Sequence, residues 1–165
     1  MDETEVTLQE MMACRERRAD LQRELLERYS TPVVSFTMNI PGPVKTDREI
    51  RKAFSIGKEE LLSHLMGFEV NDMREVHYKT GDELLLSVKA DARALKEITT
   101  EIEEETRFGR LFDMDVLDVT GEKLSRPVFR KCLICGAQAQ ECARSRKHSV
   151  QELQEKVREI LTPLS

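Results

Sequence analysis

The sequence is poor in aromatic residues. It has no tryptophan, two tyrosines and six phenylalanines, which together make up 5% of the 165 residues. Modules that bind single-stranded RNA on an open β-sheet need aromatic side chains on the central strands, where bases stack. The polar positions of the strand predicted at 33–40 are serine, threonine and asparagine instead. This composition argues against an RNA-recognition module.

Long apolar runs and an excess of positive charge are also missing. No run approaches the roughly 20 apolar residues that cross a bilayer, and the N-terminal MDETEVTLQE is acidic where a secretory leader would be basic and then apolar. The formal net charge of -5 argues against sequence-independent nucleic-acid binding. We therefore expect a cytoplasmic protein that binds neither membrane nor nucleic acid.

The length predicts a single domain that spans residues 1–165. Within it, we expect an N-terminal helix in residues 1–30, an α/β core in residues 31–120, and a Cys-rich segment with a C-terminal helix in residues 121–165. Capping residues and hydrophobic periodicity place the elements inside these segments.

The core has a recognisable order of elements. They are a helix from Thr7 to about Arg28, a strand at 33–40, a helix after Asp47, a hairpin of strands 73–79 and 83–89 around a turn at 80–82, a helix after Asp91, and a strand within 110–118. Without the first helix, this order is β-α-β-β-α-β. It predicts an α+β, ferredoxin-like antiparallel sheet with two helices on one face.

The last predicted strand, RLFDMDVLD, carries Asp113 and Asp115. Residues two apart in a strand point to the same face, so the two carboxylates should share the polar face and leave the core. The first and last strands are neighbours in this topology, which places the aspartates beside Ser35 and Thr37. We expect His77 to extend the same surface.

Two carboxylates on one strand face can hold Mg²⁺ between the protein and a phosphate. Such a metal neutralises charge on phosphoryl oxygens, which is the main demand of phosphoryl and nucleotidyl transfer. A single Asp-x-Asp pattern is also compatible with two solvent-exposed strand acids. Both interpretations remain open on the pattern alone.

Three of the four cysteines lie close together near the C-terminus. The spacing Cys132-x2-Cys135-x6-Cys142-x5-His148 provides a Cys₃His ligand set for a structural Zn²⁺. The alternative is a compact turn in which partly buried thiols fill space. After His148, Ser149 to Glu152 form a capping box that opens the C-terminal helix.

Four collinear stretches together resemble the apo-citrate lyase phosphoribosyl-dephospho-CoA transferase family, also called holo-citrate lyase synthase. They are VVSFTMNIPGPVK at 33–45, GRLFDMDVLDVTGE at 109–122, LSR at 124–126 and RKCLICGAQAQECARSRKH at 130–148. The resemblance implies transfer of the 2′-(5″-phosphoribosyl)-3′-dephospho-CoA group from 2′-(5″-triphosphoribosyl)-3′-dephospho-CoA to a serine of the citrate lyase acyl carrier protein, with release of pyrophosphate.

With this chemistry implied, the residues take candidate roles. Asp113 and Asp115 would be the catalytic residues and would hold Mg²⁺ on the triphosphate. Lysine and arginine bind phosphate oxygens by charge-assisted hydrogen bonds, and the candidates are Lys45, Arg110, Arg126 and Arg130. His77 and His148 are both candidates for a general base. The competing interpretation is a non-enzymatic, zinc-stabilised binding module.

Overall fold

A computed structural model describes residues 5–165; the first four residues of the predicted segment 1–30 lie outside the described residues. In chain order, the elements are α1 (Leu8–Tyr29), β1 (Val33–Met38), α2 (Arg48–His64), β2 (Glu69–Tyr78), β3 (Gly81–Lys89), α3 (Ala92–Glu105), a 3₁₀ turn (Gly109–Leu111), β4 (Phe112–Leu117), α4 (Ala139–Ser145), α5 (Val150–Leu161) and a final 3₁₀ turn (Thr162–Leu164). The protein is thus α+β, as predicted.

The predicted helix starts are confirmed. Thr7 and Ser149 each form a complete capping box, at the start of α1 and α5. Asp47 and Asp91 accept hydrogen bonds from backbone N–H groups three residues later and cap α2 and α3. The short helix α4 was not predicted. These caps satisfy N–H groups that have no partner within the helix.

The four strands form one antiparallel sheet in the order β2-β3-β1-β4. The register places Thr37 opposite Asp113 and Ser35 opposite Asp115, which confirms that the aspartates lie beside these residues. The β2–β3 turn consists of Lys79 and Thr80, so the turn predicted at 80–82 was placed too late and both strands are longer than predicted.

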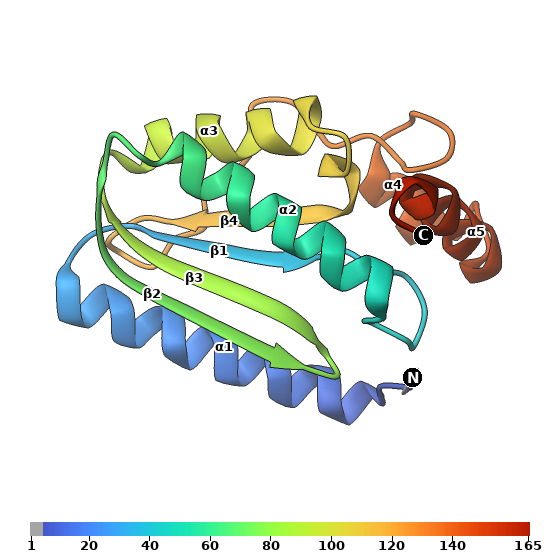
Figure 1. Ribbon diagram of the computed structural model, residues 1–165, viewed down its shortest axis with the longest axis horizontal. Coiled ribbons are helices and arrows are strands. Elements are labelled where there is room, and N and C mark those ends of the chain that lie inside the picture. Colours follow the sequence, from blue (N-terminus) through green and yellow to red (C-terminus); the bar gives the residue numbers. More distant parts are fainter. Residues whose placement is uncertain (1–4) are drawn as a thin grey trace.

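Helices α2 and α3 cover one face of the sheet and bury the main core (Figure 1). Phe36 stacks on Phe54 of α2 at 4.7 Å between ring centroids and meets Phe112 edge-on at 5.2 Å. A Cβ added to Gly57 of α2 would lie 2.5 Å from Phe36 Cζ and 2.8 Å from Phe112 Cζ. A glycine at this helix position lets α2 approach the two rings.

Helix α1 covers much of the opposite face (Figure 1). A second apolar cluster joins Leu25 and Leu26 of α1 to Val33 and Leu85 of the sheet. Gln22 Nε2 donates a hydrogen bond of 3.1 Å to Ser35 Oγ. Helix α1 therefore covers most of the polar face of the sheet, and only part of that face is open.

The outer edge of β4 is blocked by side chains of α3. The backbone N–H of Met114 donates to Glu103 Oε2 at 2.7 Å, and Lys96 Nζ donates to the Met114 carbonyl at 3.3 Å. Both charged side chains are buried. Unpaired edge strands invite pairing with other chains, and here a carboxylate and an ammonium occupy the positions that another strand would take.

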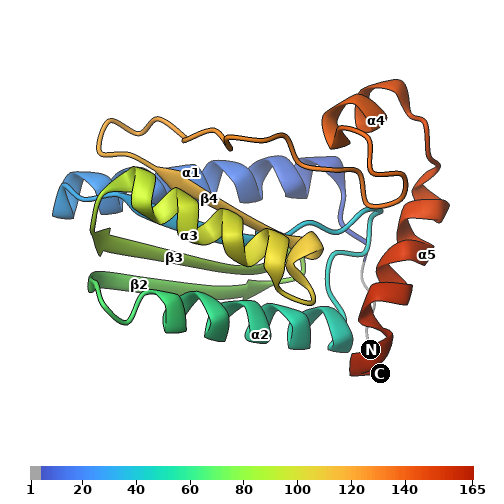
Figure 2. The ribbon, with the colours of Figure 1, turned by 90° about the horizontal axis from the view of Figure 1, so that it is seen from above.

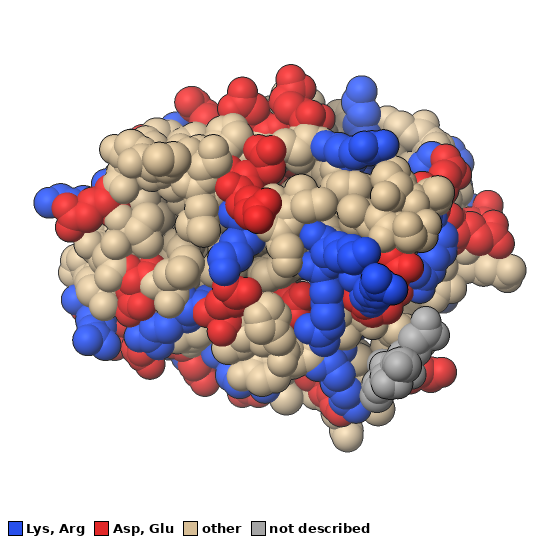
Figure 3. Space-filling view, in the orientation of Figure 1, with Lys and Arg blue, Asp and Glu red and all other residues tan. Residues whose placement is uncertain are grey.

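The C-terminal segment, residues 118–165, first runs back along the sheet and then places α4 and α5 at its end (Figure 2). Val157 and Leu161 of α5 join the main core. Acidic residues gather over α3, whereas Lys and Arg gather over the N-terminal half of α2 (Figure 3). Within residues 5–165, the structure has no helix of the length and apolarity that crossing a membrane requires.

Candidate active site and metal-binding cluster

Asp113 and Asp115 project from β4 toward the α1 side of the sheet and are both half-buried. Burial and, second, the neighbouring Asp113 carboxylate raise the pKa of Asp115. Its nearest cation is Lys123, with Nζ 3.7 Å from Asp115 Oδ2, and among residues 5–165 no ion pair of Asp113 is found. The charge of Asp113 thus acts on Asp115, and Lys123 and the buried Lys96 compensate it in part.

A hollow of about 170 Å³ lies between α1 and the end of the sheet, and we call it the α1 hollow. Asp113 lines it together with Lys45, whose Nζ donates to the Ile40 carbonyl at 2.8 Å. Burial, and then the charge of Arg15, lower the pKa of Lys45. The structure thus brings two predicted site residues, Asp113 and Lys45, to one cavity; Asp115 does not line it.

Two arginines of the α1 hollow were missed in the sequence. Arg15 and Arg18 of α1 both line the cavity; Arg18 is half-buried and Arg15 is exposed. Arg18 Nη1 pairs with the buried Glu83 at 3.0 Å, and the Cys14 thiol donates to the same carboxylate at 2.9 Å. Their only signal was an i, i+3 spacing, which could not show that α1 packs on this end of the sheet.

The predicted phosphate-binding arginines have different surroundings. Arg126 is ion-paired to Glu103 at 2.7 Å and to Glu104 at 3.0 Å. Arg130 donates to the carbonyls of Gly109 and Arg110 at 2.8 and 3.0 Å. Arg110 donates to the Lys131 carbonyl. Arg110 and Arg130 line a larger cavity near the C-terminal segment, and Arg126 does not.

This larger cavity, which we call the C-terminal groove, has a volume of about 770 Å³. It is lined by residues 39 and 41 after β1, by residues 110 and 130–133, and by parts of 139–153. Asn39 lines both the groove and the α1 hollow. The two cavities therefore meet at the end of β1, next to the start of β4.

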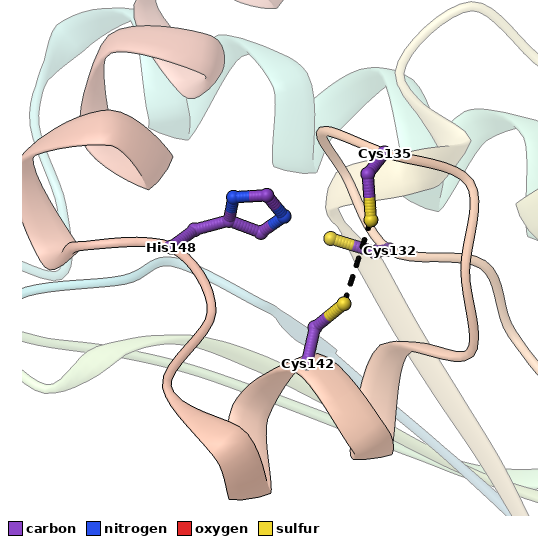
Figure 4. Close-up of side chains that lie close together, drawn as sticks. All are labelled: Cys132, Cys135, Cys142 and His148. Atoms are coloured by element: carbon purple, nitrogen blue, oxygen red, sulfur yellow. Dashed lines mark hydrogen bonds between the residues drawn. The ribbon is translucent and has the colours of Figure 1, made fainter.

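The Cys₃His residues converge as predicted (Figure 4). The ligand atoms of Cys132, Cys135, Cys142 and His148 all lie within 4.8 Å of one another. Cys135 Sγ and Cys142 Sγ are 3.5 Å apart. A tetrahedral metal with bonds of about 2.0–2.3 Å places its ligands at comparable separations. The cluster could therefore bind a metal ion.

Local structure positions each ligand of the cluster. The Cys132 N–H donates to the Ala137 carbonyl at 2.6 Å and closes a tight loop around Cys135. Cys142 comes from α4, and His148 directly precedes the Ser149 cap of α5. The buried Nε2 of His148 has no hydrogen-bond partner among residues 5–165.

The charges inside the cluster are those of a metal-ligand set. The neighbouring His148 imidazole lowers the pKa of Cys135 to about 6, and the hydrogen bond with Cys135 raises the pKa of Cys142 to about 11. Thiolates, rather than thiols, are the species that bind metal ions. The cluster already favours one thiolate beside a partnerless imidazole nitrogen.

The expectation that His77 extends the aspartate surface was wrong. Its ring packs edge-on against Phe54 of α2, and its Nδ1 lies 2.7 Å from Asp82 Oδ1. His77 is thus on the opposite face of the sheet, in the strand farthest from β4. The cause is the turn: the two-residue turn pairs His77 with Asp82, whereas the predicted turn at 80–82 would have paired it with Leu85, on the other face.

Comparison with known proteins decides the family. A sequence model described as apo-citrate lyase phosphoribosyl-dephospho-CoA transferase matches residues 6–163. The chain belongs to the apo-citrate lyase phosphoribosyl-dephospho-CoA transferase family. The resemblance inferred from the four sequence stretches is thereby confirmed.

Several proteins that carry the family's name are similar over most of their length. A transferase of Citrobacter koseri is 38% identical over 154 residues, which cover 90% of this chain and 84% of the relative. Transferases of Shigella boydii and Escherichia coli O157:H7 are 35% identical over 162 residues, 94% of this chain and 88% of each relative. The family match includes both cavities and the Cys₃His cluster.

Proposed function

We propose that this protein transfers a phosphoribosyl-dephospho-CoA group to apo-citrate lyase. The observation that carries the proposal is the family match over residues 6–163, together with relatives that are named for this transfer. The two cavities, which share Asn39 and are both lined in part by cationic side chains, provide space for a phosphorylated substrate. A purely structural binding module is not favoured.

In more detail, we infer that the donor is 2′-(5″-triphosphoribosyl)-3′-dephospho-CoA and that the acceptor is a serine of the acyl carrier protein subunit. The serine oxygen forms a bond to the phosphorus nearest the ribose. The bond from that phosphorus to the next phosphate breaks, pyrophosphate leaves, and the serine proton passes to solvent or to a base. Such reactions depend mainly on positioning and charge stabilisation.

Asp113 and Asp115 are the proposed catalytic residues. Their shared face, their half-burial and the raised pKa of Asp115 fit a pair that would hold Mg²⁺. The bound ion would neutralise charge on the triphosphate oxygens. The position of the two carboxylates is also fixed, because β4 is held on one edge by β1 and on the other by Glu103.

The proposed phosphate ligands differ in the existing contacts that they would have to break to bind a phosphate. Lys45 and Arg15 face the α1 hollow with Asp113, and Arg110 faces the C-terminal groove. Arg130 uses carbonyl contacts that hold the turn before β4. Arg126 would have to leave Glu103 and Glu104 to reach a phosphate. We therefore propose Lys45, Arg110 and Arg15 as the primary ligands, with Arg126 and Arg130 as secondary candidates.

We propose that the Cys₃His cluster holds a structural Zn²⁺. The donor set is one that zinc prefers. The buried Nε2 of His148 has no hydrogen-bond partner among residues 5–165, as expected of an atom that would bind the metal. All four ligands belong to the protein, which leaves no open position for catalysis. The ion would tie the loop at 132–135, α4 and the start of α5 together.

We further infer that the core is ferredoxin-like and that the protein is cytoplasmic. The order β2-β3-β1-β4, with α2 and α3 on one face, supports the fold assignment. All four cysteines are free thiols, which supports a reducing compartment.

The test is the mass of the acyl carrier protein after incubation with this protein, the triphosphate precursor and Mg²⁺. Asp113→Asn and Asp115→Asn each remove one carboxylate ligand of the proposed Mg²⁺, and it is this ion that would provide the compensation of phosphoryl charge. Because such compensation contributes several kcal/mol, each should slow loading by about a hundredfold or more. Asp20→Asn, on the exposed side of α1, is the control. Near-normal loading by both variants would reject the role of the aspartates.

A further inference from the structure

The C-terminal groove has the size of a ligand site. Pockets for small organic ligands are typically about 300–1,000 Å³, and the groove has about 770 Å³. The α1 hollow, where Asp113 and Lys45 lie, has only about 170 Å³. The hollow is below the usual size of a ligand pocket, so a donor that carries a nucleotide and a long arm needs additional volume.

The charge of the groove differs from that of the whole protein. The chain has a net charge of -5, yet four cations line the groove, Arg110, Arg130, Lys131 and Arg146, and no aspartate or glutamate does. Burial, followed by the charge of Arg130, lowers the pKa of Arg110. Cations that face one space without an acid between them form an anion-binding surface.

The rest of the groove lining is mainly apolar. Leu133, Ala139, Ala143 and Leu153 contribute, and the two alanines lie on α4. Small side chains on α4 leave room for a ligand to lie along the helix. The groove thus combines a cationic part with an apolar part, as needed for an elongated ligand that has phosphates at one place and an uncharged arm at another.

We propose that the C-terminal groove binds the dephospho-CoA part of the donor, while its triphosphate end reaches past Asn39 into the α1 hollow. This proposal rests on the proposed function for the identity of the donor. The adenosine and diphosphate meet the cations, and the pantetheine arm lies along α4. The C-terminal segment is then a substrate-binding wall, and the Cys₃His cluster holds that wall in place: Cys132, Cys142 and His148 all line the groove.

The first experiment measures binding of dephospho-CoA itself by calorimetry, without any transfer. Ala143→Trp fills the groove, so it should weaken dephospho-CoA binding by tenfold or more, since each lost 1.4 kcal/mol is a factor of about ten. Ala13→Trp places the same side chain on the exposed side of α1 and should leave the dissociation constant within about twofold of wild type. Asp113→Asn, outside the groove, should also leave it unchanged.

A second pair of variants avoids any large insertion. Arg146→Gln removes a groove cation and should weaken dephospho-CoA binding by about tenfold, the typical contribution of a hydrogen bond to a charged group. Arg144→Gln is the control from the last turn of α4, which Arg146 follows as the C-cap, because Arg144 is exposed, pairs with Glu141 and does not line the groove. Tripolyphosphate, used as a separate probe, should depend on Lys45 and not on Arg146.

The outcomes separate the proposals. Wild-type affinity for dephospho-CoA in folded Ala143→Trp and Arg146→Gln overturns the groove assignment. If those variants keep that affinity but raise the KM for the carrier protein, the groove binds the carrier instead. If wild-type protein binds dephospho-CoA with the predicted variant pattern but never loads the carrier, the groove assignment stands and the proposed function fails.

Discussion

The α/β core, residues 33–117, and the C-terminal segment, residues 118–165, are held together in different ways. Most of the buried apolar side chains of residues 5–165 belong to the core. Four lie in the C-terminal segment: Cys132, Cys142, Val157 and Leu161. Two of these four are members of the Cys₃His cluster.

This difference shows how the protein divides stability and binding. The core is stabilised by the burial of a continuous apolar layer, which requires no added group. The C-terminal segment has little buried apolar surface of its own, so under the proposed zinc assignment its order depends on the anchoring of α5 and on the Cys₃His cluster. The segment that forms the proposed substrate groove is therefore also the part whose order can be changed selectively.

The largest expected effect is in the core. Phe36→Ala removes a ring that contacts Phe54 and Phe112 and should lower the free energy of unfolding by about 3–5 kcal/mol. Urea unfolding measures this loss. Phe129→Ala, in the C-terminal segment, is the control, because Phe129 is exposed and its loss should be nearly neutral. Equal effects of the two variants would contradict the comparison.

The next effect is confined to the C-terminal segment. Metal chelation should remove hydrogen-exchange protection from α4 and leave β1 and β3 protected, because only the segment depends on the cluster. Thiol labelling provides a second measurement. Cys132, Cys135 and Cys142 should become reactive, whereas Cys14, which is 1% exposed and whose pKa is raised by burial and by Glu83, should react only on unfolding.

Metal analysis decides this prediction independently. The proposal requires about one Zn²⁺ per chain. Protein that is purified without metal and shows the same α4 protection with and without chelator would favour the alternative, in which the thiols only fill space.

A smaller effect distinguishes tertiary packing from helix propensity within the core. Gly57→Ala should improve the propensity of α2 by about 1 kcal/mol, but its methyl group would overlap Phe36 and Phe112. Overpacking typically costs about 1–3 kcal/mol, so we expect net destabilisation in thermal or urea unfolding. Gly67→Ala, in the turn after α2, controls for the methyl group alone, because an added Cβ there meets no atom within 4 Å. Stabilisation by Gly57→Ala would show that the rings move aside easily.

The smallest expected effect concerns the two capping boxes, one in each terminal helix. Ser149→Ala should cost about 1 kcal/mol, since it leaves the Glu152 N–H without its side-chain acceptor. Thr7→Ala removes the equivalent bond to Glu10. Hydrogen exchange should show fraying at the start of α5 in one variant and of α1 in the other. Fraying that spreads from α5 into β1 would mean that the segment and the core unfold together.

Local sequence signals predicted most of the fold. Thr7, Asp47, Asp91 and Ser149 were read correctly as caps because a side chain satisfies backbone groups only three residues away. The helix α4 had no such signal, since Gln138 forms no side-chain cap. The hairpin turn was misplaced because Gly81 opens β3 and does not occupy the loop.

Site residues were predictable where one short stretch carries them. The alternation around Asp113 and Asp115 and the spacing of the cysteines were sufficient to place these side chains together. His77 was assigned to the wrong face, and Arg15 was missed, because their positions depend on how β2 and α1 meet the rest of the sheet. Contacts between distant segments leave no periodic pattern in either segment alone.

The sequence by itself determined the order of the elements, the shared face of the two aspartates and the family, because these depend on spacing along one chain. Only the tertiary structure decided that α1 covers the aspartate side of the sheet, that Glu103 and Lys96 block the edge of β4, and that the two cavities meet at Asn39. The physical reason is that burial and charge compensation depend on which surfaces come into contact in the folded protein. The sequence pattern of a helix or strand indicates its apolar and polar faces, but it does not indicate which other element packs against them.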